Sequence, residues 1–218
     1  MFDKLKEELN RSLIAEDFLR RFFLQDINQE SLKEFLDLGK KISLELKNHE
    51  FISILRKSFE ENLADELRWE FNSLFVGPAK PKALPYESTY FDYKNMFGKK
   101  TFEVREFYKN VGLQIESKQF DRFPDDYIGF ELQYLYYMSF LALKNIESQE
   151  KLLEILKEKN DFIIYHPSKW FDKFALACKE GTKMEFYKAF ADFLLLYLKK
   201  EEENLNSAIL KFKEKKDK

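Results

Sequence analysis

The side chains best suited to binding chemistry gather at the end of one irregular segment, residues 74–90. Three of the chain's five prolines lie in it, at Pro78, Pro81 and Pro85. Carboxylate, hydroxyl and aromatic groups follow at Tyr86, Glu87, Ser88 and Tyr90. Such a set can accept charge-assisted hydrogen bonds and offer aromatic surface. Because long irregular segments are uncommon in compact domains and tend to be functional, we expect this proline-rich loop to carry part of a site.

The rest of the chain offers little for catalysis or metal binding. Two histidines, His49 and His166, are too few for most metal sites, and neither follows a glutamate at the offset used by carboxylate-bridged di-iron bundles. His166 directly precedes Pro167, so a role as a helix-end cap is favoured over a catalytic role. The single cysteine, Cys178, lies on an apolar helical face, which favours a buried thiol over a nucleophile. With no phosphate loop, dinucleotide-binding glycine pattern or nucleophile elbow, we expect a protein that is not an enzyme and uses no cofactor or metal.

Helical periodicity extends along the chain on both sides of this loop. Leu, Lys, Glu and Phe dominate while β-branched Val and Thr are scarce, which favours helix over sheet. We predict an all-α fold, a single globular bundle of roughly nine or ten helices over residues 1–218. The lone cysteine excludes an internal disulfide, and a chain of this length can bury a sufficient core without one.

Local signals predict where several helices begin and end. We expect N-caps at Ser12, Asn28 or Ser31, Thr101, Ser148 and, in a capping box with Glu185, Thr182. Gly77 and Pro78 should stop the helical region that begins near Phe51. The Pro-Asp-Asp sequence at residues 124–126 should open a strongly apolar helix, because carboxylates favour the positive end of the helix dipole.

Charge and hydropathy restrict the partners and the location of the chain. The 37 basic and 39 acidic residues give a net charge of -2 and leave no electrostatic footprint for nucleic acid. No apolar stretch approaches the roughly 20 residues that span a bilayer, and the N-terminus lacks the apolar region of a signal peptide. We therefore expect a cytoplasmic protein without stable membrane insertion. The basic run at residues 211–218 is expected to be a frayed, solvated tail.

Three segments, taken in order and spacing, resemble one family. The first is residues 69–78 (WEFNSLFVGP) followed by residues 85–90 (PYESTY), and the second is residues 123–132 (FPDDYIGFEL). The third runs from residues 166–170 (HPSKW) through Phe174 to residues 185–187 (EFY). With these motifs, which cover nearly the whole chain in order, the sequence resembles the TorD/DmsD/NarJ family of cytoplasmic chaperones for molybdoenzymes, also called redox enzyme maturation proteins.

The resemblance implies a single all-helical domain that binds the twin-arginine signal peptide, or the N-terminal region, of a client molybdoenzyme. Such a chaperone holds the apo-enzyme back from export until the molybdopterin cofactor is inserted. Domain-swapped dimers occur in the family, so a monomer and a swapped dimer both remain open. The family's binding region lies near the proline-rich loop and a Pro-x-Asp-His segment. Asp126 matches the aspartate, whereas Tyr127 replaces the histidine, which removes an imidazole contact but permits stacking or hydroxyl bonding.

On this resemblance the candidate binding residues divide into two kinds. Carboxylates that would accept guanidinium groups in bidentate pairs are Glu87, Asp126 and Glu131. Residues that would form an apolar and aromatic wall are Trp69, Phe75, Tyr86, Tyr90 and Tyr127. Ser88 joins the first set as a neighbour of Glu87. Structural interpretations stay open beside these: Glu87, Ser88 and Asp126 as helix caps, and Trp69 and Phe75 as core residues, which is the favoured interpretation for that pair.

Two other functions remain as alternatives. One is an assembly scaffold for a membrane-bound oxidoreductase that acts on the mature body of its client. The other is a nucleotide-dependent assembly factor, which the absence of a phosphate loop disfavours. The sequence does not choose among clients: reductases of dimethyl sulfoxide, trimethylamine oxide or nitrate, and formate dehydrogenase, all remain open.

Overall fold

A computed structural model describes residues 2–77, 79–91, 97–115 and 123–216 of the chain. These residues form α-helices, one π-helix and one 3-10 helix, with no β-strand among them, which confirms the predicted all-α fold. The elements are α1 (Phe2–Leu24), α2 (Gln29–Gly39), α3 (Leu44–Lys47), α4 (Glu50–Glu60), α5 (Ala64–Phe71), the π-helix η1 (Asn72–Val76), the 3-10 helix η2 (Glu87–Tyr90), α6 (Lys99–Asn110), α7 (Ile128–Lys144), α8 (Gln149–Tyr165), α9 (Pro167–Gly181) and α10 (Glu185–Lys216).

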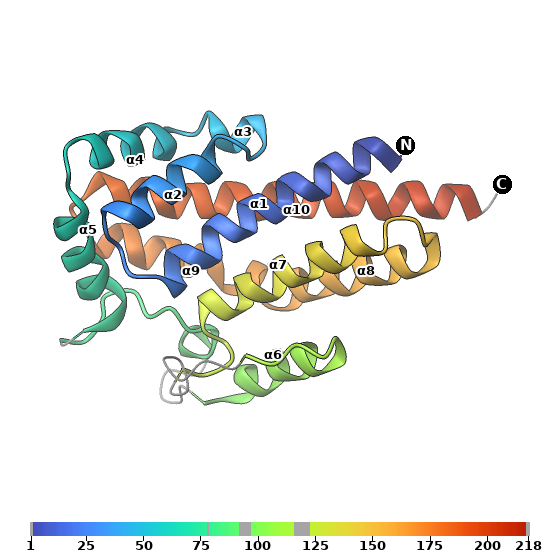
Figure 1. Cartoon of the computed structure of the whole chain (residues 1–218). Helices are drawn as coiled ribbons and strands as arrows, with labels where there is room; N and C mark the ends of the chain where they lie inside the picture. The colour runs from blue at the N-terminus through green and yellow to red at the C-terminus, as the bar shows by residue number, and fades with distance from the viewer. Residues whose placement is uncertain (1, 78, 92–96, 116–122, 217–218) are drawn as a thin grey trace.

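The long C-terminal helix α10 forms the axis of the bundle. Its 32 residues extend about 48 Å at 1.5 Å per residue, and it packs against α1, α3, α4, α8 and α9. Helix α7 packs on α1 and α8, while α6 lies at the lower edge beside η2 (Figure 1). Aromatic rings fill the space between α1 and α10, where Phe22 stacks on Phe190 with ring centroids 3.7 Å apart. One contiguous cluster of buried apolar residues therefore runs through the bundle.

Several helix ends follow the prediction. Asn28 caps α2 in a reciprocal capping box with Ser31. His166 separates α8 from α9, and α9 ends at Gly181. Gly77 ends η1 with a φ of 120°, a conformation that only glycine adopts readily, while Pro78 lies outside the described residues. Within the described ranges, no helix combines the length and the apolar character that crossing a membrane requires.

Predicted ends are wrong where a polar side chain has a distant partner instead of a local one. Ser12 lies inside α1 and donates to Glu201, because α1 begins ten residues earlier than its apolar face suggests. Thr101 lies in the first turn of α6, which Gly98 caps, and donates to Asp126.

The helical region after Phe51 breaks at Asn62, which has a φ of 57°. The expected frayed tail is helical as far as Lys216, with Phe212 buried.

A buried lysine connects four helices at the centre of the bundle. Lys159 of α8 is 0% exposed, and its ammonium group lies 2.6 Å from Oε1 of Glu16 on α1. The same ammonium group pairs with Glu201 of α10 and donates to Ser139 of α7 at 2.7 Å. Tyr197 donates to Glu16 at 2.9 Å, and Ser12 donates to Glu201 at 2.6 Å. We call this set the Lys159 network: Ser12, Glu16, Ser139, Lys159, Tyr197 and Glu201.

Two buried carboxylates share this one cation. Burial raises the pKa of Glu16 to about 7, against the opposing pull of Lys159 and with the added repulsion of Glu201. Burial acts to lower the pKa of Lys159, but the two carboxylates outweigh it and the net shift is upward. The lysine is therefore held in its charged form, and Glu16 is the group of the network that titrates near neutrality.

Replacing Lys159 by methionine should lower the free energy of unfolding by about 3–5 kcal/mol, because it leaves two buried carboxylates without a cation. Urea denaturation at pH 7.5 measures the change. Lys188→Met is a control, since Lys188 pairs with Glu185 on the surface and should change stability by less than about 1 kcal/mol. Adding Glu16→Gln and Glu201→Gln to Lys159→Met should restore part of the loss. No restoration would mean that packing, not charge, causes it.

The raised pKa of Glu16 should also make stability fall as pH rises. Below pH 4.5 the group is protonated in both states, whereas between pH 4.5 and 7 the unfolded chain releases the proton first and is favoured. The contribution of Glu16 should therefore fall by roughly 3 kcal/mol over this window and stay level above it. Urea titrations from pH 5 to 8 should show this slope in the parent and a flatter one in Glu16→Gln. Glu45→Gln, an exposed carboxylate nearby, should keep the parent slope.

Candidate functional site

The proline-rich loop is joined to the segment that precedes α7. The backbone N–H of Glu87 donates to the carbonyl of Asp126 at 3.1 Å, and that of Ile128 donates to the carbonyl of Pro85 at 2.9 Å. These bonds form an antiparallel bridge between Tyr86 and Tyr127. Because the loop carries Tyr86–Ser88 and the other segment carries Asp126 and Tyr127, the structure brings two of the predicted motifs together.

Asp126 holds this junction through its side chain. The carboxylate accepts from the backbone N–H of Ser88 at 2.7 Å and from the hydroxyl of Thr101 at 2.8 Å. It is 0% exposed, and α7 begins two residues later with Tyr127 at its N-cap. The expectation that Asp126 caps the apolar helix α7 is therefore wrong. Its partners are η2 and α6, which are distant in sequence and gave no local signal.

Glu87 and Glu131 lie in the same buried layer. Oε2 of Glu87 lies 2.7 Å from Nδ1 of His166, and its Oε1 lies 3.5 Å from the ammonium group of Lys100. Glu131 accepts from the indole N–H of Trp170 at 3.1 Å. Burial, followed by repulsion from Glu87, raises the pKa of Glu131 well above its usual range and favours the protonated acid. His166, interpreted from the sequence as a helix-end residue, also connects the loop to α9.

The three predicted carboxylates are thus internal supports in this conformation. Glu87, Asp126 and Glu131 are each 0% exposed, and Ser88 is 1% exposed. They link η2, α6, α7 and α9 and leave no access for a guanidinium group from solvent. Direct pairing of these carboxylates with a peptide stays a prediction, and it requires the loop to move away first.

Tyr127 anchors the junction to the end of α1. Its hydroxyl donates to the carbonyl of Phe23 at 2.8 Å, and its ring stacks on Phe123 with centroids 5.0 Å apart. Helix α7 approaches α1 so closely here that a Cβ on Gly129 would lie 2.9 Å from a methyl group of Leu24. The tyrosine therefore makes both kinds of contact within the protein, while stacking or hydroxyl bonding to a peptide stays a prediction.

The other predicted aromatic residues divide between core and surface. Phe75 is buried against Phe71, with centroids 4.9 Å apart, which matches its interpretation as a core residue. Trp69 is 73% exposed on α5, so the core interpretation of that residue is wrong. Tyr86 packs on Tyr127, with centroids 5.5 Å apart. Tyr90 is half-buried and packs on Trp170 at a centroid distance of 5.4 Å.

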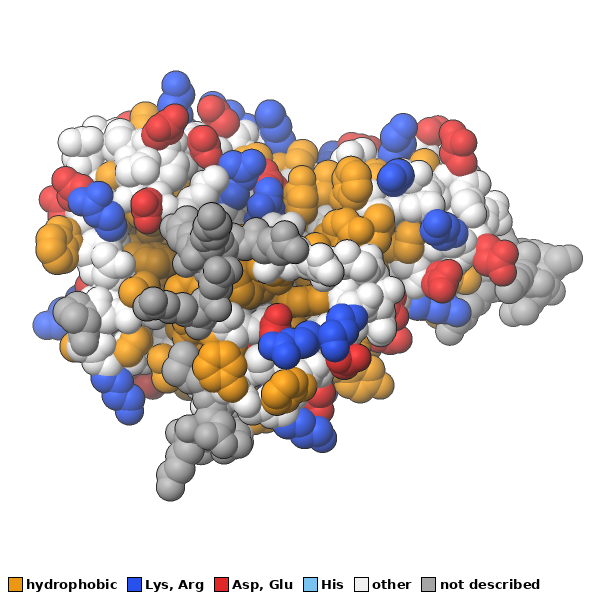
Figure 2. Space-filling model, turned by 60° about the horizontal axis from the view of Figure 1, so that its bottom comes forward, with side chains coloured by type: hydrophobic (Ala, Val, Ile, Leu, Met, Phe, Trp, Pro, Cys, Tyr) orange, Lys and Arg blue, Asp and Glu red, His pale blue; other side chains and the backbone are white. Residues whose placement is uncertain are grey.

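An apolar hollow of about 270 Å³ opens beside this junction. Its apolar lining comes from the end of α1 and the turn after it, from α5 and η1, and from the segment before α7: Phe23, Leu24, Ile27, Phe71, Val76, Phe123 and Tyr127. Figure 2, which brings the underside of Figure 1 forward, shows hydrophobic side chains gathered across the middle of this face, with charged side chains around them. Of the predicted site residues, only Tyr127 lines the hollow. The sequence did not indicate the other lining residues, because they come together only when three distant segments pack.

A second, more polar hollow of about 320 Å³ continues from the first. The two share Leu24, Gln25 and Asp26 in the turn between α1 and α2. The second is lined further by Glu30 and Glu34 on α2. We call the first the apolar hollow and the second the acidic margin.

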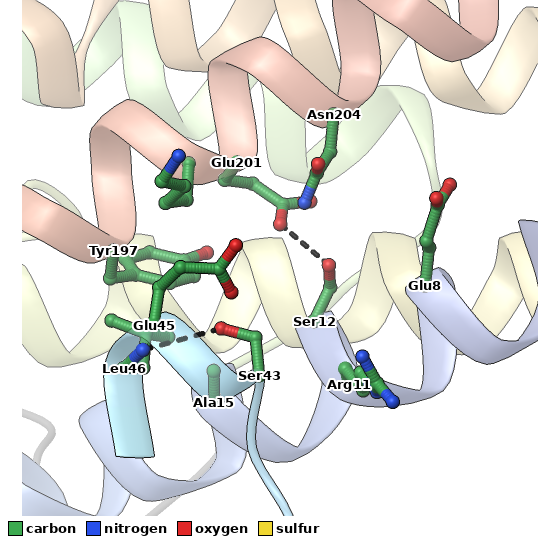
Figure 3. Close-up of a pocket in the computed structure, with 11 residues that line it drawn as sticks. Glu8, Arg11, Ser12, Ala15, Ser43, Glu45, Leu46, Tyr197, Glu201 and Asn204 are labelled. Atoms are coloured by element: carbon green, nitrogen blue, oxygen red, sulfur yellow. Dashed lines mark hydrogen bonds between the residues drawn. The ribbon is translucent and has the colours of Figure 1, made fainter. Parts of the chain in front are cut away.

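Another pocket, of about 150 Å³, lies over the Lys159 network. Figure 3 shows Ser12, Tyr197 and Glu201 facing it, with the bond from the Ser12 hydroxyl to the Glu201 carboxylate inside. Ser12 donates to Glu201, which pairs with Lys159, and Tyr197 donates to Glu16, so these groups belong to the internal support of the bundle. The apolar hollow, whose lining is largely apolar, is the better candidate for binding.

Comparisons with known proteins agree with the motifs. Residues 28–176 match the family model described as nitrate reductase delta subunit. The chain is 28% identical over 144 residues to chaperone protein TorD of Vibrio cholerae, covering 66% of this chain and 64% of that protein. The alignment therefore spans slightly less than two thirds of that relative. Against TorD of Vibrio parahaemolyticus the identity is 28% over 179 residues, covering 81% of this chain and 82% of the relative.

Two further matches extend the comparison. The chain is 24% identical over 153 residues to a Haemophilus influenzae protein named as the Tat proofreading chaperone DmsD, covering 69% of this chain and 66% of that protein. A solved Archaeoglobus fulgidus structure, described as a redox enzyme maturation protein, shares the fold with a TM-score of 0.56. It has 20% sequence identity and covers 87% of this chain and 93% of its own. The family match over more than half of the sequence shows that this chain belongs to the nitrate reductase delta subunit family, the TorD/DmsD/NarJ group that its motifs predicted.

Proposed function

We propose that this protein is a cytoplasmic chaperone, and not an enzyme, for a molybdenum-dependent oxidoreductase. It binds the twin-arginine signal region at the N-terminus of the client and holds the apo-enzyme for molybdopterin insertion before export. The family match and relatives named TorD and DmsD chaperones support this proposal. Membership in the family supports a client of the molybdoenzyme class without naming which one.

The observation that carries the proposal is the apolar hollow between α1, α5–η1 and Tyr127. Signal peptides contain an apolar run, and an extended or helical apolar segment is the ligand that an aromatic-lined hollow accommodates. Each Leu-sized side chain that leaves water contributes about 1.5–3 kcal/mol, so two or three such contacts supply about 3–9 kcal/mol toward binding, before the costs of association and ordering. Val76, which lines the hollow, is 58% exposed and so offers apolar surface that a peptide can reach.

The predicted site residues take two roles in this proposal. Tyr127 contacts the peptide as part of the wall, whereas Trp69 does not line the hollow and offers exposed aromatic surface elsewhere on α5. Phe75 and Tyr86 pack behind the wall, Tyr90 fixes η2 on Trp170, and the buried acids Glu87, Asp126 and Glu131 with Ser88 hold the loop in place. These acids therefore act on peptide binding through the position of the loop, unless the loop opens to expose them.

Val76→Asp should weaken binding of an apolar signal peptide at least tenfold, which corresponds to about 1.4 kcal/mol, because it places a charge at the mouth of the hollow. Calorimetric titration with signal peptides of molybdoenzymes measures the affinity. Leu176→Asp is the matched control: Leu176 is 55% exposed on α9 and does not line the hollow, so its replacement should leave affinity unchanged.

Three outcomes count against the proposal. The parent protein could bind no signal peptide of any molybdoenzyme. Both aspartate variants could bind equally well, which would place the peptide elsewhere. The protein could bind the mature body of a client whose leader has been removed as tightly as the full client, which would favour the assembly scaffold instead. Circular dichroism of each variant confirms that a loss of binding is not a loss of fold.

Neighbouring aspartates provide a test of the support role of the buried acids. Asp126→Ala should lower the free energy of unfolding by about 2–4 kcal/mol, because it leaves the Ser88 N–H and the Thr101 hydroxyl without their buried acceptor. Asp125→Ala removes only a partly exposed pair with Arg105 and should change it by no more than about 1 kcal/mol. Urea denaturation measures both. Equal small effects would mean that Asp126 is not a structural support.

A further inference from the structure

The acidic margin adjoins the apolar hollow along the turn between α1 and α2. Leu24, Gln25 and Asp26 line both, so a bound chain can pass from one to the other without leaving the surface. Asp26, Glu30 and Glu34 are all exposed, and each carries a carboxylate. The two hollows together make one groove that is apolar at one end and negatively charged at the other.

Two of these carboxylates have no cation among the residues that the structure describes. Glu34 lies 3.4 Å from a guanidinium nitrogen of Arg21, whereas no described cation lies within 4.0 Å of Asp26 or Glu30. The only cation lining the apolar hollow in the described part of the chain, Arg68, hydrogen-bonds to Asp65 at 2.8 Å. The negative charge of Asp26 and Glu30 is therefore free to meet a cation that comes with a partner.

The fold of the turn does not require these two charges. Asn28 and Ser31 form the capping box of α2 without help from Asp26. Glu30 lies in the first turn of α2, where a carboxylate favours the helix dipole, but this effect contributes little at an exposed position and applies to any acid there. Local helix stability thus accounts for Glu30 only in part and for Asp26 not at all.

We infer that Asp26 and Glu30 bind the paired arginines of the signal region, while the apolar run that follows the arginines enters the apolar hollow. The inference rests on the proposed function and adds which surface reads the arginines. Charge complementarity favours this occupant, because arginines followed by an apolar run match exposed carboxylates that lie beside apolar surface. Guanidinium groups suit the site better than ammonium groups, since each presents a planar fork of donors to a carboxylate.

The test compares one double variant, Asp26→Asn with Glu30→Gln, with a control that removes the same charge elsewhere. The control is Glu150→Gln with Glu154→Gln, two exposed carboxylates on α8 that line a different hollow. Three peptides are titrated calorimetrically at low and at physiological salt. They are a signal peptide with its arginine pair, the same peptide with lysines in place of the arginines, and the apolar run alone.

The double variant should bind the arginine peptide about tenfold more weakly than the parent at low salt, with a smaller difference at physiological salt. Its affinity for the apolar run alone should be unchanged. The parent should prefer arginine to lysine, and the double variant should lose that preference. The α8 control should behave as the parent with all three peptides.

The outcomes separate this inference from the proposed function. If the double variant binds the arginine peptide as tightly as the parent while Val76→Asp loses binding, the inference about the acidic margin is overturned and the proposed function stands. An equal loss in the α8 control also overturns it, because general charge then explains the effect. If the parent binds none of the three peptides, the proposed function fails and the inference fails with it.

Discussion

The bundle depends on one buried cation. Lys159 on α8 is shared by Glu16 of α1 and Glu201 of α10, and its remaining bond goes to Ser139 of α7, so the two ends of the chain and its middle meet at a single ammonium group. A buried charge is tolerated only when its partners are in place. The Lys159 network therefore constrains the relative positions of α1, α7, α8 and α10, because each partner must stay within hydrogen-bond distance of the ammonium group.

That alignment reaches the candidate site through α1 and α7. The end of α1 provides Phe23 and Leu24, and the start of α7 provides Gly129, whose missing Cβ allows the two helices to approach at this point. The bond from the Tyr127 hydroxyl to the Phe23 carbonyl then joins the segment before α7 to the same helix end. The apolar hollow opens next to this contact, so its shape is set by a helix pair whose register is held at the Lys159 network, farther along both helices.

The sequence predicted the helical fold, the proline-rich loop and its association with residues 124–131, because these follow from periodicity, from prolines and from motifs. It also predicted the cap of α2, because the two capping residues, Asn28 and Ser31, are close in sequence and bond to each other. It failed for Ser12, Thr101 and Asp126, whose side chains suit a cap but bind residues that are 25 to 189 positions away. The apolar hollow could not be predicted from the sequence either, because its lining comes from three separate stretches of chain.

The acids near the hollow divide into buried ones that support the fold and exposed ones at the rim. Glu87, Asp126 and Glu131 belong to the motifs by which the family is identified, yet they are buried and bonded to His166, Ser88, Thr101 and Trp170. A residue held by several internal partners cannot be replaced without leaving those partners unsatisfied, so a motif of such residues marks the part of the fold that must stay constant. Exposed groups at the rim of the hollow, such as Asp26 and Val76, carry no such constraint. Under the proposed function, partner selection can therefore change at the rim while the buried junction beneath it keeps the loop and the hollow in place.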